Sequence, residues 1–230
     1  MRLLAWNIRQ GGGSRLAAIG EALARHDADI LVLSEYHPGD SGQRLRTLLQ
    51  TLGYPHASRI EPPPGRKGVL IAARTPLREI GPLTTDVAEP HRLINVAVGP
   101  LHLTGVYMPN LLAKTPYWEA LLAILAPRLR RRAIAIGDFN TCRAHLDEAG
   151  ATDRTGHYMD RIDTIGFHDL WRRRNPQRRE YSWFSHRQNG FRIDHAFLSP
   201  PLARRAGPIT YSHTEREAGL SDHSVLLVEI

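Results

Sequence analysis

The sequence predicts one α/β domain with mixed β-sheets that spans residues 1–230. Three observations predict this fold class. Apolar runs of strand length recur along the whole chain, amphipathic helical patterns lie between them, and several strand-like runs in the middle are directly consecutive. The chain is long enough to bury a large core, and its 42% hydrophobic and 23% charged residues are typical of a globular protein.

The strands are predicted where short apolar runs are bounded by polar or turn-forming residues. A proline-rich segment at residues 61–65 marks a loop inside the domain, because strand and helix patterns continue on both sides of it. In chain order the predicted strands cover residues 3–8, 30–33, 69–73, 93–98, 101–107, 133–136, 193–198 and 225–230.

Three helices are predicted between these strands. Residues 14–26 carry three apolar side chains on one face, with Ser14 as the expected N-cap. Residues 41–52 carry four leucines at the i, i+3, i+4, i+7 spacing of an amphipathic helix. Residues 117–129 end near Pro127 and a cluster of arginines, which suits a helix C-terminus.

The charge of the chain indicates one class of partner. The formal net charge is +7, and all but two of the 30 basic residues are arginines. Arginine binds phosphate groups through paired hydrogen bonds, and a basic surface raises the affinity for nucleic acid. Coding bias towards arginine explains the same composition equally well, so charge alone does not decide between the two.

Several features predict a cytoplasmic protein without a membrane partner. No apolar run approaches the ~20 residues that cross a bilayer, and the first ten residues lack the apolar region of a signal peptide. Cys142 is the only cysteine, which excludes an intrachain disulfide. No obligate protein partner is evident.

Unusual polar residues stand at the ends of the predicted strands. Turn formation explains each of them alone, but not all of them together. Acids and amides gathered at the rim of a sheet provide oxygen ligands, which suit Mg²⁺, and Mn²⁺ is expected to substitute for it. The polar residues at or near the ends of the predicted strands are Asn7, Glu35, Tyr107, Asn110, Asp138, Asn140, Asp194, Asp222 and His223.

These residues lie in six short motifs, which occur along the chain in the order WN, SE, YMPN, GDFN, FRIDH and SDH. The ordered set resembles the endonuclease/exonuclease/phosphatase superfamily over essentially the whole chain. The resemblance implies a four-layer α/β sandwich of the deoxyribonuclease I type, in which two packed mixed β-sheets are flanked by helices. It implies a metal site formed by Asn7 and Glu35, with Asp222 as a further acid. The phosphate contacts that it implies are Tyr107, Asn110 and Asn140.

The same resemblance assigns the reacting groups. Asp138 is expected to orient or deprotonate the attacking water. Asp194 is expected to hold His223, whose imidazole would face the scissile phosphate. Hydrolysis is then a direct attack of water on phosphorus, without a covalent intermediate.

Within the superfamily, the tyrosine of YMPN resembles the exonuclease III and abasic-site endonuclease branch. By the same alignment Trp183, Phe191 and Ile193 would line an apolar pocket for an extruded sugar. Two departures leave the substrate open. The second motif reads SEYH where the branch usually has QE followed by T and K, and the chain is short for the branch.

The densest basic segment is "WRRRNPQRR" at residues 171–179. A solvated loop is the simplest interpretation, but crowded like charges repel one another unless an anion relieves them. We therefore expect Arg172, Arg173 and Arg174 to contact a phosphate backbone.

The sequence thus predicts a Mg²⁺-dependent phosphodiester hydrolase, most similar to an abasic-site endonuclease or 3′-exonuclease acting on DNA. One alternative is a phosphatase or phosphodiesterase of a small phosphorylated metabolite or lipid headgroup. A second alternative is a non-catalytic nucleic-acid-binding protein on the same scaffold, which degraded motifs would have favoured.

Overall fold

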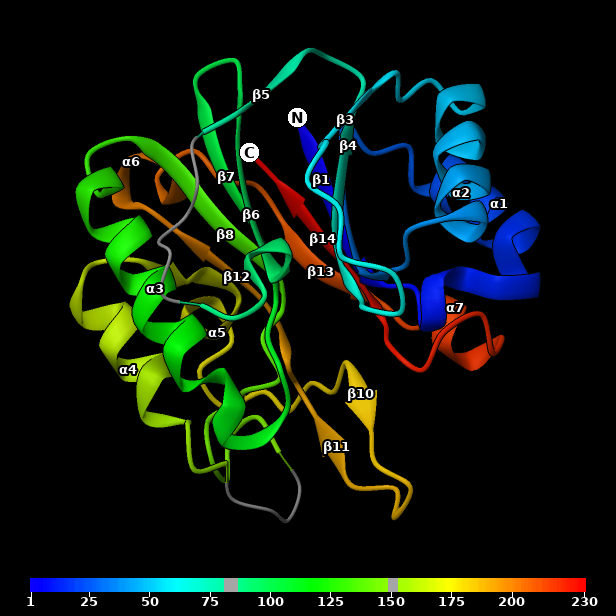
Figure 1. Cartoon of the computed structure of the whole chain (residues 1–230). Coiled ribbons are helices and arrows are strands. Elements are labelled where there is room, and N and C mark those ends of the chain that lie inside the picture. Colours follow the sequence, from blue (N-terminus) through cyan, green and yellow to red (C-terminus); the bar gives the residue numbers. More distant parts are fainter. Residues whose placement is uncertain (81–86, 149–152) are drawn as a thin grey trace.

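The computed structural model describes residues 1–80, 87–148 and 153–230. Two six-stranded sheets pack face to face, and helices cover the outer face of each sheet (Figure 1). The predicted four-layer α/β sandwich with mixed sheets is therefore confirmed. Within the described part of the chain, no helix combines the length and the apolar character needed to span a bilayer.

The first sheet has the strand order β13-β14-β1-β2-β4-β3, and only β1 and β2 pair in parallel. Its strands are β1 (Arg2–Asn7), β2 (Ile30–Tyr36), β3 (His56–Ala57), β4 (Gly68–Ala73), β13 (Ile209–Ser212) and β14 (Val225–Glu229). The helical segments beside it are η1 (Gln10–Arg15), α1 (Leu16–His26), α2 (Asp40–Thr51) and α7 (Thr214–Glu217).

The second sheet has the order β5-β6-β7-β8-β12-β9, and only β7 and β8 pair in parallel. Its strands are β5 (Leu77–Glu79), β6 (Leu93–Val98), β7 (Leu101–Tyr107), β8 (Arg132–Asp138), β9 (His168–Asp169) and β12 (Asp194–Leu198). The helices of this half are η2 (Pro90–Arg92), η3 (Leu111–Lys114), α3 (Thr115–Leu125), η4 (Ala126–Arg128), α4 (His157–Thr164), α5 (Leu170–Arg174) and α6 (Pro200–Ala203). A separate hairpin consists of β10 (Trp183–Phe184) and β11 (Gly190–Phe191).

The long central strands are mainly apolar because both of their faces are buried. Alternate residues of a strand point to opposite faces, so Leu3 and Ala5 of β1 belong to the core between the sheets. Leu4 and Trp6 belong to the core under α1 and α2. A third core packs α3 and α4 on the second sheet. A strand buried on two faces reads as a continuous apolar run, which is the pattern that the sequence shows.

All eight predicted strands are present, with small shifts at their ends. The structure adds short strands of two to four residues, which are too brief to give a period. The three predicted helices are also present, but the N-cap prediction at Ser14 was wrong. Ser14 lies in η1, and α1 begins two residues later after Arg15, with no side-chain cap.

The topology brings distant polar residues to one edge of the sandwich. β1, β2, β7 and β8 end there, and the antiparallel strand β12 begins there. The register places Tyr107 beside Asp138, and Asp138 beside Asp194. The polar strand ends noted in the sequence therefore lie close together.

Candidate active site

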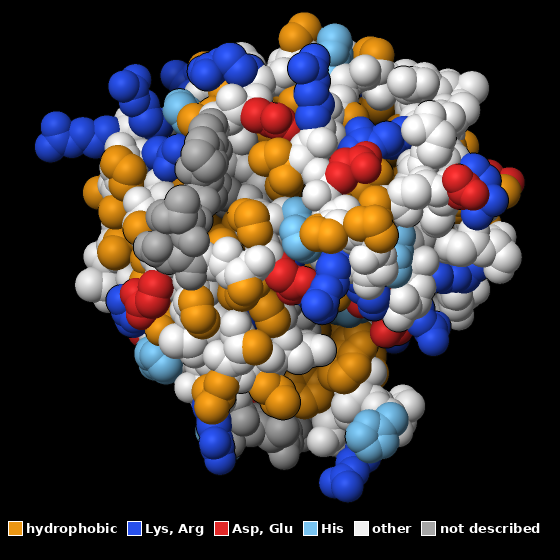
Figure 2. Space-filling view, in the orientation of Figure 1, with side chains coloured by type: hydrophobic (Ala, Val, Ile, Leu, Met, Phe, Trp, Pro, Cys, Tyr) orange, Lys and Arg blue, Asp and Glu red, His pale blue; other side chains and the backbone are white. Residues whose placement is uncertain are grey.

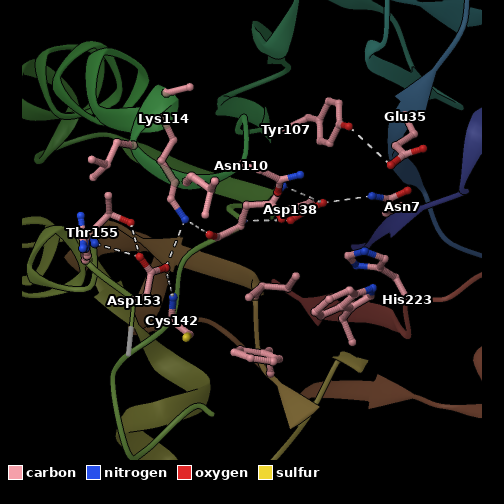
Figure 3. A pocket seen from close by; sticks show the side chains of 18 of the residues that line it. Asn7, Glu35, Tyr107, Asn110, Lys114, Asp138, Cys142, Asp153, Thr155 and His223 are labelled. Carbon is pink, nitrogen blue, oxygen red and sulfur yellow. Dashed lines mark hydrogen bonds and ion pairs between the residues drawn. The ribbon is translucent and has the colours of Figure 1, made fainter. Parts of the chain in front are cut away.

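One pocket of about 1070 Å³ lies at this edge of the sandwich. Figure 3 shows Asn7, Glu35, Tyr107, Asp138 and His223 pointing towards one another within it. These residues come from both sheets, so the site forms only when the two sheets pack together. The pocket also contains Asn110, Asn140, Trp183, Phe191, Ile193 and Asp222 from the sequence-predicted set.

Asp194 and His223 form a buried hydrogen-bonded pair. The Nδ1 atom of His223 lies 2.9 Å from Oδ2 of Asp194, and both residues are almost fully buried. Two contacts fix their backbones: the indole N–H of Trp6 donates to the His223 carbonyl, and Ser182 Oγ accepts from the Asp194 N–H. Burial disfavours the charged imidazole, but the Asp194 carboxylate outweighs it and raises the pKa of His223 to about 9. His223 is therefore a cation at neutral pH.

Asp138 is the second buried acid and lies at the end of β8. The preceding Gly137 has φ 142°, and a Cβ there would lie 2.1 Å from the Val106 carbonyl oxygen, so only glycine permits this close approach to β7. Asn7 Nδ2 and the Asn140 N–H donate to the two carboxylate oxygens of Asp138 at 3.0 and 2.9 Å. Burial, with the nearby Asp194 charge, raises the pKa of Asp138 to about 7. A carboxylate that titrates near neutral pH is suited to general-base chemistry.

Glu35 reaches the pocket through an irregularity in β2. The pairing of β2 with β4 shifts register between Ser34 and Tyr36, and Glu35 itself has φ 59°, a left-handed conformation. Bulges of this kind redirect a side chain and are frequent at active sites. The carboxylate accepts from Lys67 Nζ at 2.7 Å and from the Gln10 N–H at 2.8 Å. Burial opposes ionisation, but these two donors lower the pKa of Glu35 below its usual range.

Tyr107 stands between Glu35 and Asp138. Its hydroxyl lies 3.4 Å from Oε1 of Glu35, and the Arg92 guanidinium packs 4.6 Å above its ring. Burial and the Glu35 charge raise the pKa of Tyr107, so the phenol keeps its proton. It can donate a hydrogen bond to an anion in the pocket.

Asn140 is held in a single orientation at the other side of Asp138. Its φ is 47°, and its amide donates to the Met108 carbonyl at 2.8 Å. Lys114 Nζ donates to the Asn140 carbonyl and lies 3.1 Å from Asp153. Lys114 is only 3% exposed, so it braces this loop.

An aromatic wall lies beside Asp222. The Trp183 indole donates to Asp222 Oδ2 at 3.2 Å, and the rings of Trp183 and Phe191 are 5.6 Å apart. Ile193 continues the apolar lining. In Figure 2, hydrophobic side chains gather in the lower part of the face shown.

A divalent cation could bind either at the cluster of Asp138, Asp194 and His223 or at the carboxylate of Glu35. Among the described residues, Asp138, Asp194 and His223 are the group of acids and histidines whose ligand atoms lie within 4.8 Å of one another. His223 is a poor ligand there, because its charged imidazole is hydrogen-bonded to Asp194. Glu35 fits better: it is ionised, and its present partner Lys67 already places a cation 2.7 Å from its oxygen.

The three arginines expected at a phosphate backbone do not line this pocket, and the part of the segment that contains them is a helix, not a loop. Residues 170–174 form α5, capped by the Asp169 side chain. Arg172 is 7% exposed and donates to Asp147 at 2.5 Å. Arg174 donates to the carbonyls of Ala206 and Gly207.

Arg172 belongs to a buried ionic network. Arg192, which is fully buried, joins Asp147 and Asp169 at 2.8 and 2.6 Å. Together these contacts tie α5, β9 and the segment before β12 to one another. Arg173 is exposed, with 52% of its side chain accessible and Asp163 3.8 Å away.

The Arg172→Ala variant should be less stable than the parent by about 3 kcal/mol in its free energy of unfolding, because it breaks a buried ion pair. Arg173→Ala is the matched control and should change stability by less than about 0.5 kcal/mol. Urea unfolding of the two variants measures both values. Unchanged stability of Arg172→Ala with weakened DNA binding would restore the interpretation of Arg172 as a phosphate ligand.

The sequence patterns did not predict a role for Lys67 and Lys114, the two lysines of the chain. Lys67 binds Glu35, and Lys114 braces Asn140 and Asp153. A signal was present: in a chain whose other basic residues are all arginines, both lysines lie at the site. Lysine provides a compact charge on a flexible stem, which arginine does not reproduce.

A sequence model of the Endonuclease/Exonuclease/phosphatase family matches residues 4–223, whereas no curated protein matches the sequence. An AP endonuclease from Archaeoglobus fulgidus has a TM-score of 0.86 at 22% identity, covering 99% of this chain and 98% of that chain. A 3′ phosphatase from Neisseria bound to a product DNA hairpin has a TM-score of 0.86 at 23% identity, and the match covers 100% of this chain and 99% of that chain. A 3′–5′ exonuclease from Neisseria meningitidis has a TM-score of 0.84 at 24% identity, and the match covers 100% of this chain and 99% of that chain.

Proposed function

Because the chain belongs to the endonuclease/exonuclease/phosphatase family, we propose that it is a divalent-metal-dependent phosphodiester hydrolase that acts on DNA. The observation that carries this proposal is that two groups with different pKa values, Asp138 and His223, lie in one pocket. Asp138 titrates near neutral pH, and His223 remains charged 2.9 Å from Asp194. A base and a cation beside one another are the groups that hydrolysis of a phosphate ester by water requires.

In the proposed reaction, Asp138 accepts a proton from water as the water oxygen attacks phosphorus. Asn7 and Asn140 hold the carboxylate in place for this transfer. The bond from phosphorus to the leaving oxygen breaks opposite the attack, and the leaving oxygen takes up a proton from solvent. His223, oriented by Asp194, then faces the negative charge that develops on the phosphate oxygens and stabilises the transition state more than the substrate.

The remaining polar side chains position the phosphate. Tyr107 keeps its proton and can donate to a phosphate oxygen, and Asn110 lines the same pocket. Asn140 is rigid because Met108 and Lys114 hold its amide and its carbonyl. Preorganised donors of this kind need no rearrangement during the reaction.

We propose that Glu35 and Asn7 hold the metal ion, with Asp222 as a further acid near the site, and that the ion is Mg²⁺ or Mn²⁺. A hard divalent cation prefers carboxylate and amide oxygens and neutralises charge on phosphate oxygens. Lys67 and the Gln10 N–H both donate to Oε2 of Glu35, so Oε1, which lies 3.4 Å from the Tyr107 hydroxyl, would be available to the cation. Asp222 already accepts a hydrogen bond from Trp183, which fixes the orientation of its carboxylate.

Replacing Glu35 by Gln should raise the Mg²⁺ concentration needed for half-maximal activity by at least about tenfold, because the only charged ligand of the proposed pair is lost. Activity titrations with Mg²⁺ and Mn²⁺ measure this shift. Glu21→Gln, at an exposed position on α1, is the matched control. An unchanged metal requirement in Glu35→Gln would exclude Glu35 as a ligand.

The plot of kcat/KM against pH should be bell-shaped, with inflections near pH 7 and pH 9. Asp138 must lose its proton to act as a base, so kcat/KM rises as pH passes about 7. His223 must keep its proton, so kcat/KM falls as pH passes about 9. Initial rates on a small phosphodiester between about pH 5 and pH 10 give the profile. A profile that is flat through both limbs would contradict the two assignments.

Several features support DNA as the substrate. The pocket is large enough for a nucleotide unit, and Trp183, Phe191 and Ile193 give it an apolar wall against which a sugar can pack. The net charge of +7 favours a polyanion. The structurally similar proteins include an AP endonuclease and a 3′ phosphatase bound to a DNA hairpin.

The proposal is tested with a panel of duplex DNA with and without an abasic site, single strands, RNA and small phosphodiesters, in Mg²⁺ or Mn²⁺. Duplex DNA should be cleaved with the highest kcat/KM, and its KM should rise steeply with salt, by about 0.9 log unit per phosphate contact per log unit of salt. Preference for a small diester, with no salt dependence for any nucleic acid, would favour the small-molecule alternative.

A further inference from the structure

Seven arginines gather at the end of the second sheet that lies opposite the active site. β8 begins at Arg132 and ends at Asp138, and a strand rises about 3.3 Å per residue, so the two ends of β8 lie about 20 Å apart. The β6–β7 turn, η4 and α6 are at the same end as Arg132. The arginines, which we call the distal arginine patch, are Arg78, Arg128, Arg130, Arg131, Arg132, Arg204 and Arg205.

The strand register places these arginines side by side. Arg78 of β5 and His102 of β7 both pair with Ala97 of β6, so they lie in one row on the same face of the sheet. The start of α6 is tied to the same end, because the Ser199 hydroxyl donates to the Arg131 carbonyl. Neighbouring strands lie about 4.8 Å apart, and four such steps separate β5 from β12, so the patch extends about 19 Å across the sheet.

The charges of the patch act together on His102. Its two chain neighbours face the core between the sheets, so its own side chain faces outwards. Burial lowers the pKa of His102, and the charges of Arg128, Arg131 and Arg78 lower it further. These three guanidinium groups come from η4, the turn before β8 and β5, and they act on one imidazole.

No acidic side chain compensates this charge. Within residues 1–80, 87–148 and 153–230, none of the seven arginines forms an ion pair, whereas Arg74 and Arg161 on other surfaces do. Figure 2 shows Lys and Arg side chains at the upper left, where α6 and the β6–β7 turn lie in Figure 1. Like charges without partners repel one another, and a bound anion relieves this repulsion.

The chemistry of the patch favours a nucleic acid over a protein or a membrane. Arginine donates paired hydrogen bonds to phosphate. The core of a protein interface is apolar, and a helix at a membrane surface needs apolar side chains that enter the lipid. In the described part of the chain the exposed large hydrophobic residues are Met1, Leu111 and Leu112, and none of them belongs to the patch.

We propose that the distal arginine patch binds the phosphate backbone of a second nucleic-acid segment, separate from the one in the active-site pocket. One duplex cannot fill both places, because DNA has a persistence length of about 150 bp and does not fold back across a sandwich about 20 Å deep. A duplex carries one negative charge per ~1.7 Å, so about 11 phosphates face a patch of this width. The second segment would hold the protein on long DNA while the pocket releases one site and meets the next.

The test is a capture experiment in EDTA, so that binding is measured without metal-dependent cleavage. An abasic duplex of about 20 bp is attached to beads and loaded with protein, and an intact fluorescent duplex of the same length is then added. The parent should capture the fluorescent duplex. Arg130→Gln/Arg131→Gln should capture less, and its slope of log affinity against log salt should be shallower by about 1.8, or about 0.9 for each lost contact.

The control variant Arg25→Gln/Arg44→Gln removes the same charge from exposed positions on α1 and α2. It should capture the fluorescent duplex as the parent does. Thermal melting should show that Arg130→Gln/Arg131→Gln is at least as stable as the parent, because the substitutions remove repulsion within the patch.

Activity gives a second readout of the same variants. On an abasic duplex of about 20 bp, the kcat/KM of Arg130→Gln/Arg131→Gln should stay within about twofold of the parent value. On an abasic site in plasmid-length DNA it should fall at least about fivefold, because only long DNA offers a second segment at high effective concentration.

Three results would overturn the patch as a nucleic-acid site. One is a parent protein that loads onto the beads but captures no second duplex, which leaves the proposed function intact. Another is an equal loss of capture in the patch and control variants, or capture by a protein dimer that sedimentation detects without DNA. The third is patch-dependent binding to phosphatidylserine vesicles without capture of a duplex. Loading that depends on Arg130 and Arg131 alone would instead support the patch and contradict DNA binding at the pocket.

Discussion

The Asp138→Asn variant should lose about three orders of magnitude in kcat, within the 10²–10⁴-fold range that general acid–base catalysis contributes. The amide has nearly the same shape as the carboxylate but only one acceptor oxygen, so it keeps one of the two hydrogen bonds from Asn7 Nδ2 and the Asn140 N–H. It cannot accept a proton from water. The loss should therefore fall on kcat, with little change in KM.

Single-turnover rates of the variant on duplex DNA at saturating Mg²⁺ measure this loss. Asp160→Asn, at an exposed position on α4, is the control and should retain the parent rate. Thermal unfolding should show that the Asp138→Asn protein is folded. A variant within tenfold of the parent would show that Asp138 is not the proton acceptor.

The His223→Asn variant should lose about 10²-fold or more in kcat, by analogy with the loss of one oxyanion donor. Asparagine keeps a hydrogen-bonding group near Asp194 but carries no charge to oppose the phosphate oxygens. Asp194→Asn should lose a similar amount, because His223 then loses both its orientation and the carboxylate that keeps it protonated.

The double variant distinguishes a working pair from two independent residues. If Asp194 acts through His223, the Asp194→Asn/His223→Asn protein should be little worse than either single variant. His145→Asn is the control variant, because it also replaces a histidine but at a side chain that is 83% exposed. Strictly multiplicative losses in this cycle would show that the two residues work separately.

The sequence predicted much of the sandwich and of the site, because both depend on local patterns. A strand buried on two faces is a continuous apolar run, and a polar residue such as Asp138 at its end is visible without a structure. The order of six motifs then indicated the family and, through it, the layers. The short strands β3 and β9 gave no such signal, because each depends on pairing with a longer strand.

The remaining site residues depend on contacts between distant segments. Lys67 lies in a loop before β4, and nothing near it in the chain indicates that it reaches Glu35. The bulge that turns Glu35 into the pocket is a feature of its pairing with β4, not of its own residue type. These features become visible only once the strand register is known.

For Arg172, the sequence predicted a contact with a phosphate backbone, whereas the structure places its side chain in a buried ion pair. A run of arginines is more often a surface feature than a buried one, because a buried charge is costly without a partner. The partners here, Asp147 and the carbonyls that follow α5, compensate that cost. Asp147 is 25 residues away in the chain, so the buried role of Arg172 could not be seen in the sequence.

The central claim is that this pocket hydrolyses a phosphodiester by attack of water on phosphorus. Cleavage of abasic duplex DNA in H₂¹⁸O with Mg²⁺, followed by mass spectrometry of the products, tests it most directly. One ¹⁸O atom should appear on the product phosphate, and chelation with EDTA should abolish the cleavage, because the metal and the Asp138 base act on the same water attack. Cleavage that leaves the phosphate unlabelled, as elimination at the sugar would, or cleavage that persists in EDTA, would contradict it.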